Sequence, residues 1–407
     1  MMPEPGRLDS IDALRGWAIL GVVTCHTAIW CPPPGDLLHR LALSGAAGVQ
    51  LFYIVSAFTL LLSYHSRPGG ETRSWWFFYL RRFFRIAPLF YLAILVYGPL
   101  RELAPQYWLP EGIVWWHWAS AFTFLHAWHP HAVNALVPGG WSLSVEMTFY
   151  LLFPLYLLVA TTLRRALLLF VALTLVGVLY QQWAIGFFAD AFAERHLHYL
   201  HHYAEVFAPP VQLPVFALGF IVFMLTGMRW QATPLIMKDI PVNFTLSQSR
   251  WISPSRVRWV SLSLIVAAGT GYVLAVFMDP QWVPGHVTLA VCLAALVYAI
   301  TLYPWRLIVN PVMIFIGRIS YSLYVVHFGV IWLWRWISPD GHFIGDGHVD
   351  ALIAWVLVLF PSVMAAYVSF VAIEQPGIRL GGKVIMRLRD SLCSVSDRQK
   401  QTACKPE

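Results

Sequence analysis

The sequence predicts an all-α polytopic membrane protein, a bundle of about ten transmembrane helices with both termini in the cytoplasm. Of its 407 residues, 58% are hydrophobic and only 12% are charged, whereas soluble domains carry about 25% charged residues. The mean hydropathy is +0.63, and apolar stretches long enough to cross a bilayer recur along the chain. The formal charge of +7 comes mostly from loop Lys and Arg, which set membrane topology. We therefore expect a lipid bilayer as a partner, and no nucleic acid.

Hydropathy predicts membrane-spanning helices at residues 11–31, 43–64, 83–103, 139–160, 166–184, 209–228, 258–278, 286–304, 311–334 and 351–373. One further apolar stretch, 113–128, is short and carries His117 and His126. Its composition alone does not decide whether it crosses the membrane.

The distribution of Lys and Arg decides the topology, because these residues concentrate in cytoplasmic loops. If 113–128 does not cross, most of the 27 Lys and Arg fall on one side, and only Arg40, Arg101, Arg195 and Arg335 fall on the other. We therefore expect both termini in the cytoplasm and residues 104–138 outside it. Residues 1–382 are expected to form one transmembrane domain, and the polar residues 383–407 a disordered cytoplasmic tail.

The cysteines and histidines give no metal or disulfide framework. The five Cys are scattered, at Cys25, Cys31, Cys292, Cys393 and Cys404, without a metal-type spacing. The outer segments hold a run of histidines at His196, His198, His201 and His202. We interpret this run as an amphipathic interfacial segment, a metal site being the less favoured alternative, and we expect no metal cofactor.

The first span, IDALRGWAILGVVTCHTAIWC, carries two ionisable residues, Arg15 and His26. An ionisable side chain inside the bilayer is costly, so it suggests a functional site. Eleven residues correspond to about three helical turns, which places both side chains on one face, about 16 Å apart along the axis. A snorkelling Arg and a His bonded to a neighbouring helix explain this pair equally well.

Depths estimated from the helical rise arrange the polar residues in two layers. The inner layer is cationic and contains Arg15, Arg82, Arg85 and Arg318; the outer layer contains His26, Glu146 and His327. Clustered guanidinium groups suit phosphates, which they bind bidentately. A His beside a carboxylate suits removal of a proton from a hydroxyl, with Glu146 orienting His26. Positive-inside topology is the alternative for the Arg layer, but it explains Arg15 and Arg318 poorly.

Six sequence blocks resemble those of the acyltransferase family three of integral membrane proteins, in order and from Arg7 to about Gly382. They are RLDSIDALRGWAILGVVTCH at the start, GVQLFYIVSAFTLLLSY (48–64), RRFFRIAPLFY (81–91), WSLSVEMTFYLLFPL (141–155), GRISYSLYVVHF (317–328) and IEQPGIRL (373–380). The second block departs from the family at Gln50, where an acidic residue is frequent, and at Ala57, where Gly is frequent.

The resemblance implies an enzyme of the bacterial inner membrane. It would move an acetyl group from cytosolic acetyl-CoA, its co-substrate, to a hydroxyl of a glycan or glycolipid at the extracytoplasmic side. Carried over residue by residue, Arg15 and His26 are the essential pair, Arg82 and Arg85 the basic pair, and Glu146 the acid. Arg15, Arg82, Arg85 and Arg318 are expected to hold the CoA phosphates, with Arg15, His26 and Glu146 as catalytic residues. Trp141, Ser142, Tyr150 and His327 are expected to line the acceptor pocket.

Three alternatives stay open at this point. His26 acts either as general base or as a nucleophile that takes the acyl group. The acyl group and acceptor could instead be succinyl and a lipid or small molecule. In a different class, a transporter or flippase would use Arg15, His26 and Glu146 as a proton relay, although the sequence lacks the internal repeats that many transporters show.

Overall fold

A computed structural model describes residues 8–65, 75–102, 109, 112–227, 254–278 and 284–403, with side chains to residue 391 except those of residues 195 and 254. The described residues form helices and connecting turns, without a strand. The α-helices are α1 (Asp9–Trp30), α2 (Asp36–Ser44), α3 (Gly48–His65), α4 (Trp75–Glu102), α5 (Trp115–Phe122), α6 (Trp141–Val159), α7 (Leu163–Phe188), α8 (Leu197–His202), α9 (Pro209–Leu225), α10 (Pro254–Met278), α11 (Gly285–Leu302), α12 (Pro311–Arg318), α13 (Ser320–Ile337), α14 (Gly347–Ser369) and α15 (Gln375–Ala403). Short turns of 3₁₀ or π helix are η1 (Gly45–Ala47), η2 (His126–Trp128), η3 (Ala189–Ala191), η4 (Glu194–His196), η5 (Tyr203–Phe207) and η6 (Phe370–Glu374).

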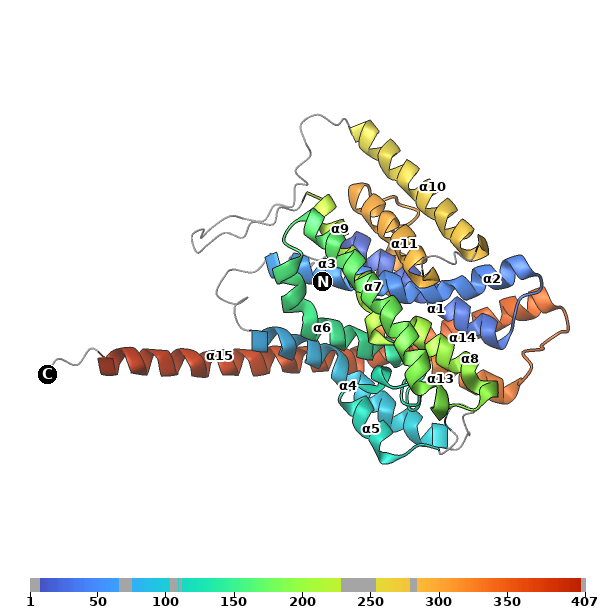
Figure 1. The fold of residues 1–407 in the computed structure, drawn as a ribbon, viewed down its shortest axis with the longest axis horizontal. Coiled ribbons are helices and arrows are strands. Elements are labelled where there is room, and N and C mark those ends of the chain that lie inside the picture. The colour runs from blue at the N-terminus through green and yellow to red at the C-terminus, as the bar shows by residue number, and fades with distance from the viewer. Residues whose placement is uncertain are drawn as a thin grey trace.

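The helices pack as one bundle around α1 and α3 (Figure 1). Helix α1 contacts α3, α12, α13 and α14, and α3 contacts α9 and α11. Among the described residues, 8 helices are long and apolar enough to cross a membrane, or up to 9 if the bent pair α12 and α13 is one span. Helix α1 is not among the 8, because Arg15 and His26 reduce its hydropathy. The protein is therefore a polytopic helical membrane protein, as its sequence predicts.

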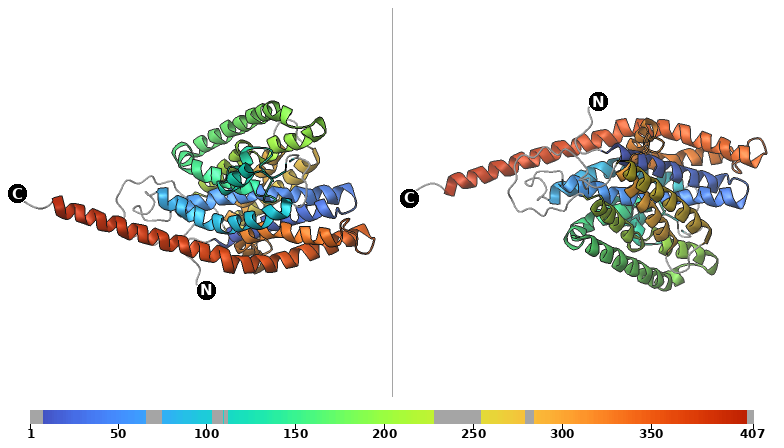
Figure 2. Two further views of the ribbon diagram at one scale, coloured as in Figure 1. Left: turned by 90° about the horizontal axis from the view of Figure 1, so that it is seen from below. Right: turned by 90° about the horizontal axis from the view of Figure 1, so that it is seen from above.

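Two regions depart from simple spans. Helix α5 has 8 residues, or about 12 Å of rise, which is too short to cross a bilayer. Helix α15 continues from α14 through η6 and runs out of the bundle to Ala403 (Figures 1 and 2). The polar composition of residues 383–407 predicts a disordered tail, whereas residues 383–403 are helical. No Gly or Pro interrupts the chain between Lys383 and Ala403, so nothing stops the helix.

A bend of 76° separates α12 from α13 at Ile319. Just before it, Gly317 of α12 lies directly against the backbone of Asp12 in α1, and Gly16 of α1 lies against the carbonyl of Met313. A side chain at either glycine would push the two helices apart. This close approach fixes the start of α13 relative to α1.

We expect Gly317→Ala to destabilise the protein by about 1–3 kcal/mol, because its methyl group would overlap the carbonyl oxygen of Asp12. The measurement is thermal unfolding of the purified protein in detergent. Gly269→Ala in α10 is the matched control, because a Cβ there meets nothing within 4 Å and alanine favours the helix. Unfolding of Gly317→Ala at the wild-type temperature would contradict the close packing.

Candidate active site

A central cavity lies between α1, α3, α4, α6 and α13. Its polar lining comprises Arg15, Tyr53, Ser56, Thr59, Arg82, Arg85, Ser142, Glu146, Tyr150, Ser320, Tyr321 and Tyr324. Six of the residues expected from sequence therefore meet in one space: Arg15, Arg82, Arg85, Ser142, Glu146 and Tyr150. The helices that carry them are distant in sequence and are brought together by packing on α1 and α3.

Three guanidinium groups dominate one part of the central cavity. Arg82 and Arg85 are three residues apart on α4, so they lie on one helix face, and Arg15 reaches the cavity from α1. The Nε of Arg82 is buried and has no hydrogen-bond partner in the structure. Buried donors are normally satisfied, so this part of the cavity suits an anionic group.

Glu146 is held inside the central cavity by two hydroxyl groups. Ser56 Oγ donates to Glu146 Oε1 at 2.8 Å, and the Tyr150 hydroxyl donates to the same oxygen. The guanidinium carbon of Arg82 lies 5.8 Å from the centre of the Tyr150 ring. Glu146 and Tyr150 thus form the wall facing the arginines.

The N-terminus of α13 also faces the central cavity, through Ser320 and Tyr321. The first N–H groups of a helix have no intrahelical partner and carry partial positive charge. Ser320 is fully buried, and its Oγ has no hydrogen-bond partner in the structure. The bend at Ile319 brings these donors to the cavity, where they add to the anion-binding character of the arginines.

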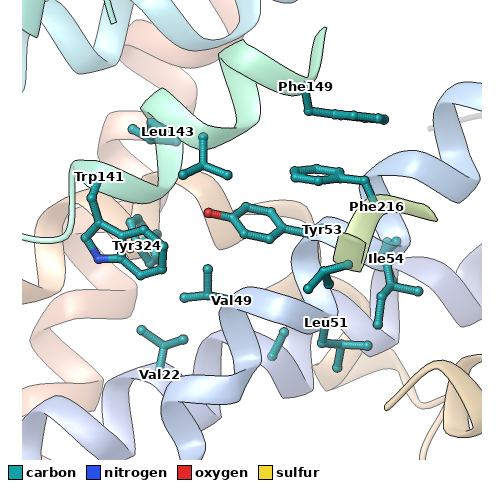
Figure 3. Close-up of a cluster of buried hydrophobic side chains, with 14 of the residues drawn as sticks. Val22, Val49, Leu51, Tyr53, Ile54, Trp141, Leu143, Phe149, Phe216 and Tyr324 are labelled. Carbon is teal, nitrogen blue, oxygen red and sulfur yellow. The ribbon is translucent and has the colours of Figure 1, made fainter. Parts of the chain in front are cut away.

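Hydrogen bonds join α3, α6 and α13 at the other end of the central cavity. Figure 3 shows Tyr53 and Tyr324 among the buried side chains of this region. Ser142 Oγ donates to the Tyr324 hydroxyl at 2.8 Å, and that hydroxyl donates to the carbonyl of Gly139 at 2.8 Å. Tyr53 donates to the carbonyl of Ser142 at 3.1 Å. Tyr324 is therefore fixed at the boundary of the cavity.

His26 and His327 form a pair behind Tyr324. His327 Nε2 and His26 Nδ1 are 3.1 Å apart, and the ring centres of His327 and Tyr324 are 5.9 Å apart. His327 Nδ1 lies 3.1 Å from the carbonyl of Leu323, which only accepts, so Nδ1 carries the proton. Neutral His327 then accepts at Nε2 from His26 Nδ1–H. This leaves His26 Nε2 unprotonated, as a base requires.

Several residues expected at one site from the sequence lie apart in the structure. Glu146 is bonded by Ser56 and Tyr150, and His26 by His327, so no hydrogen bond of the described residues joins Glu146 to His26. Arg318 lies outside the central cavity, 41% exposed, and forms ion pairs with Asp9 at 3.6 Å and Asp12 at 3.4 Å. Trp141 is buried against Phe207, with ring centres 5.0 Å apart, and does not line the cavity.

Glu374 is a buried carboxylate that is not among the site residues expected from the sequence. It ends η6 and is 3% exposed. Ser322 Oγ donates to its Oε2 at 2.8 Å. Its carboxylate interacts electrostatically with Arg15, as do those of Asp12 and Glu146. Glu374 thus supplies negative charge behind the arginines from the last helices of the bundle.

Histidines of the segment between α4 and α6 lie outside the spans. Burial, together with the neighbouring His131, lowers the pKa of His117 and of His129 to about 4, so both are neutral at physiological pH.

Within the described residues, no group of three or more His, Cys, Asp or Glu side chains could hold a metal ion.

Comparisons with known proteins connect this site to a family. A family model described as "Acyltransferase domain" matches residues 8–371. The chain is 26% identical to "Acyltransferase MdmB" of Streptomyces mycarofaciens over 94% of this chain and 95% of that protein. It is 24% identical to "Putative O-acetyltransferase SACOL0978" of Staphylococcus aureus over 93% of this chain and 58% of that protein. A shorter match, over 42% of this chain and 50% of the relative, is 30% identical to "Nodulation protein 10" of Rhizobium leguminosarum. No solved structure matches the chain.

The matched segment contains the whole of the central cavity and the His26–His327 pair. It leaves out Glu374 and the whole of the long helix α15. With this match across most of its length, the chain belongs to the acyltransferase family three of integral membrane proteins.

Proposed function

We propose that this acyltransferase moves an acetyl or other short acyl group from cytosolic acyl-CoA to a carbohydrate hydroxyl on the far side of a bacterial cytoplasmic membrane. One observation carries the proposal: a single cavity has three arginines in one part and the His26–His327 pair just behind its opposite boundary. Acyl-CoA has a matching order of chemical groups, with phosphates at one end and a reactive thioester at the other. The name of the staphylococcal relative supports a hydroxyl as acceptor.

The donor head would bind at the arginines. Arg15, Arg82 and Arg85 pair with phosphate oxygens, and the N-terminus of α13 adds its N–H groups and the Ser320 hydroxyl. The pantetheine arm then runs past Ser56 and Tyr150 toward Ser142 and Tyr324, so that the thioester lies near the cavity end that His26 approaches.

His26 would act as general base. Its Nε2 takes the proton of the acceptor hydroxyl while that oxygen attacks the thioester carbonyl carbon. The C–S bond breaks, the ester forms, and the departing CoA sulfur receives the proton from the imidazolium. His327 fixes the tautomer of His26 and shares the charge of the imidazolium, the role that the sequence predicts for Glu146.

The proposal is tested with the purified protein in nanodiscs, radiolabelled acetyl-CoA and an oligosaccharide acceptor. We expect saturable binding of acetyl-CoA, release of free CoA thiol and label in the oligosaccharide. Absence of acetyl-CoA binding, or proton-coupled solute uptake by the same protein in liposomes without any transfer, would overturn it in favour of a transporter.

A further inference from the structure

Two hydroxyl groups share one backbone carbonyl at the end of the central cavity that lies beside His327. The Tyr324 hydroxyl donates to the carbonyl oxygen of Gly139 at 2.8 Å. Ser142 Oγ lies 3.1 Å from the same oxygen and 2.8 Å from the Tyr324 hydroxyl. Both side chains are buried and line the cavity. We call Ser142 and Tyr324 the hydroxyl pair.

The hydroxyl pair carries two protons, whereas the shared carbonyl needs only one of them. In one arrangement Tyr324 donates to Gly139 and Ser142 donates to Tyr324, so both protons are used within the protein. In the other, Ser142 donates to Gly139, and the Tyr324 O–H is free to donate to a ligand in the cavity. The change needs only rotation of the two O–H bonds, and the buried carbonyl is bonded in both arrangements.

Neighbouring hydroxyl groups of the cavity lining are less suited to this role. Ser56 and Tyr150 both donate to Glu146, whose charge repels an anion that forms beside them. Tyr53 and Tyr321 each donate to a backbone carbonyl. In the described part of the chain, no second hydroxyl donates to either of these carbonyls, so releasing the tyrosine would leave no hydroxyl in its place.

The surroundings of the hydroxyl pair favour a developing negative charge. Ser142 and Leu143 belong to the first turn of α6 and line the cavity, and the N–H groups of a first turn carry partial positive charge. The Tyr324 ring also lies beside the ring of His327, the partner of His26, with centres 5.9 Å apart. A carbonyl oxygen bonded to Tyr324 is therefore close to both a helix N-terminus and the histidine pair.

We propose that Tyr324 is a catalytic residue that donates its O–H to the carbonyl oxygen of the acyl thioester, while Ser142 replaces it on Gly139. The proposal rests on the proposed function, because it adds a donor at the thioester end of the same substrate. When the acceptor oxygen attacks the carbonyl carbon, the electron pair of the C=O double bond moves to the bonded oxygen, and it returns as the C–S bond breaks. Tyr324 keeps its proton, so the proton still passes from the acceptor through His26 to the CoA sulfur. The hydrogen bond strengthens with the charge, so it acts mainly in the transition state.

Replacing Tyr324 by phenylalanine should lower kcat about 10²–10³-fold, the usual loss for one oxyanion donor. The Kd for acetyl-CoA should stay near the wild-type value, because the bond to the ground-state carbonyl replaces one within the protein. Both are measured on the full-length protein in nanodiscs with an oligosaccharide acceptor. Tyr156→Phe is the matched control, since its buried hydroxyl donates to the carbonyl of Leu213 at 2.8 Å outside the cavity lining; kcat should not change.

The serine of the hydroxyl pair gives a second test. Ser142→Ala should lower kcat about ten-fold, because Tyr324 must then leave the Gly139 carbonyl without a hydroxyl. Since Ser142 acts through Tyr324, it is a positioning residue, and the double variant Ser142→Ala/Tyr324→Phe should be no slower than Tyr324→Phe alone. Multiplied losses in the double variant would contradict a shared role.

Infrared difference spectra with acetyl-CoA labelled with ¹³C at the thioester carbonyl test the contact without turnover. In the wild-type protein the carbonyl band should move to lower wavenumber than in water, and in Tyr324→Phe it should move back. A wild-type band at its position in an apolar solvent, or an unchanged kcat in Tyr324→Phe, would overturn the role of Tyr324 while leaving the proposed function in place. If the wild-type protein neither binds acetyl-CoA nor transfers acetyl, the proposed function fails and this role fails with it.

Discussion

Replacing His26 by alanine should reduce acyl transfer by about 10²–10⁴-fold, the usual contribution of a positioned general base. Binding of acetyl-CoA should stay near its wild-type value, because His26 does not line the central cavity, the proposed donor site. The measurements are acetyl incorporation into an oligosaccharide and calorimetric titration with acetyl-CoA, both on purified protein.

Two further histidine variants separate chemistry from folding. His348→Ala is the matched control, since His348 is exposed at the start of α14, and its activity should not change. His327→Phe should give a loss smaller than that of His26→Ala, because it removes the group that fixes the tautomer but keeps the base. Loss of acetyl-CoA binding in His26→Ala would instead assign His26 to the donor site.

Replacing Arg15 by alanine should weaken acetyl-CoA binding by about ten- to one-hundred-fold, because a hydrogen bond to a charged group contributes about 1.5–3 kcal/mol. Turnover at saturating donor should fall much less than in His26→Ala, since the two side chains are about 16 Å apart on α1. Arg15→Lys should recover part of the affinity, because it keeps the charge but loses the bidentate geometry.

The same titration distinguishes the arginines from one another. Arg318→Ala should lose less affinity than Arg15→Ala, because Arg318 is half exposed and engaged by Asp9 and Asp12 outside the central cavity. Equal losses of acetyl-CoA affinity in the two variants would show that Arg318 also belongs to the donor site. Unchanged affinity for acetyl-CoA in Arg15→Ala would show that the donor does not bind in the central cavity.

The sequence predicts the bundle and the grouping of Arg15, Arg82 and Arg85, because hydropathy and helical rise determine depth in the membrane. It places Glu146 in a separate outer layer, whereas Glu146 lines the same cavity as these arginines. Depth does not determine the direction in which a side chain points around its helix. Glu146 and His26 are expected at similar depth, yet each is bonded by residues of other helices. The rotation of each helix about its axis and its packing against neighbouring helices determine these hydrogen-bond partners. A single sequence carries little information about either.

Local breaks in helices explain the other differences. Arg318 has the depth of the cationic layer, but the bend of 76° at Ile319 ends its helix, and Arg318 pairs with the start of α1. The same bend brings Ser320 to the central cavity. Ser56 and Ser320 are uncharged residues in apolar spans, so the sequence does not single them out as site residues. Glu374 is visible as an acidic residue beside the last span, and its burial could have been anticipated from that position.

The most direct test of the central claim is the sidedness of transfer in proteoliposomes, with orientation determined by protease access to a tag after Glu407. The account predicts label in the oligosaccharide only when acetyl-CoA is on the side of α15 and the oligosaccharide is on the opposite side. Efficient transfer with both substrates on one side, or with acetyl-CoA supplied only from the side opposite α15, would contradict it.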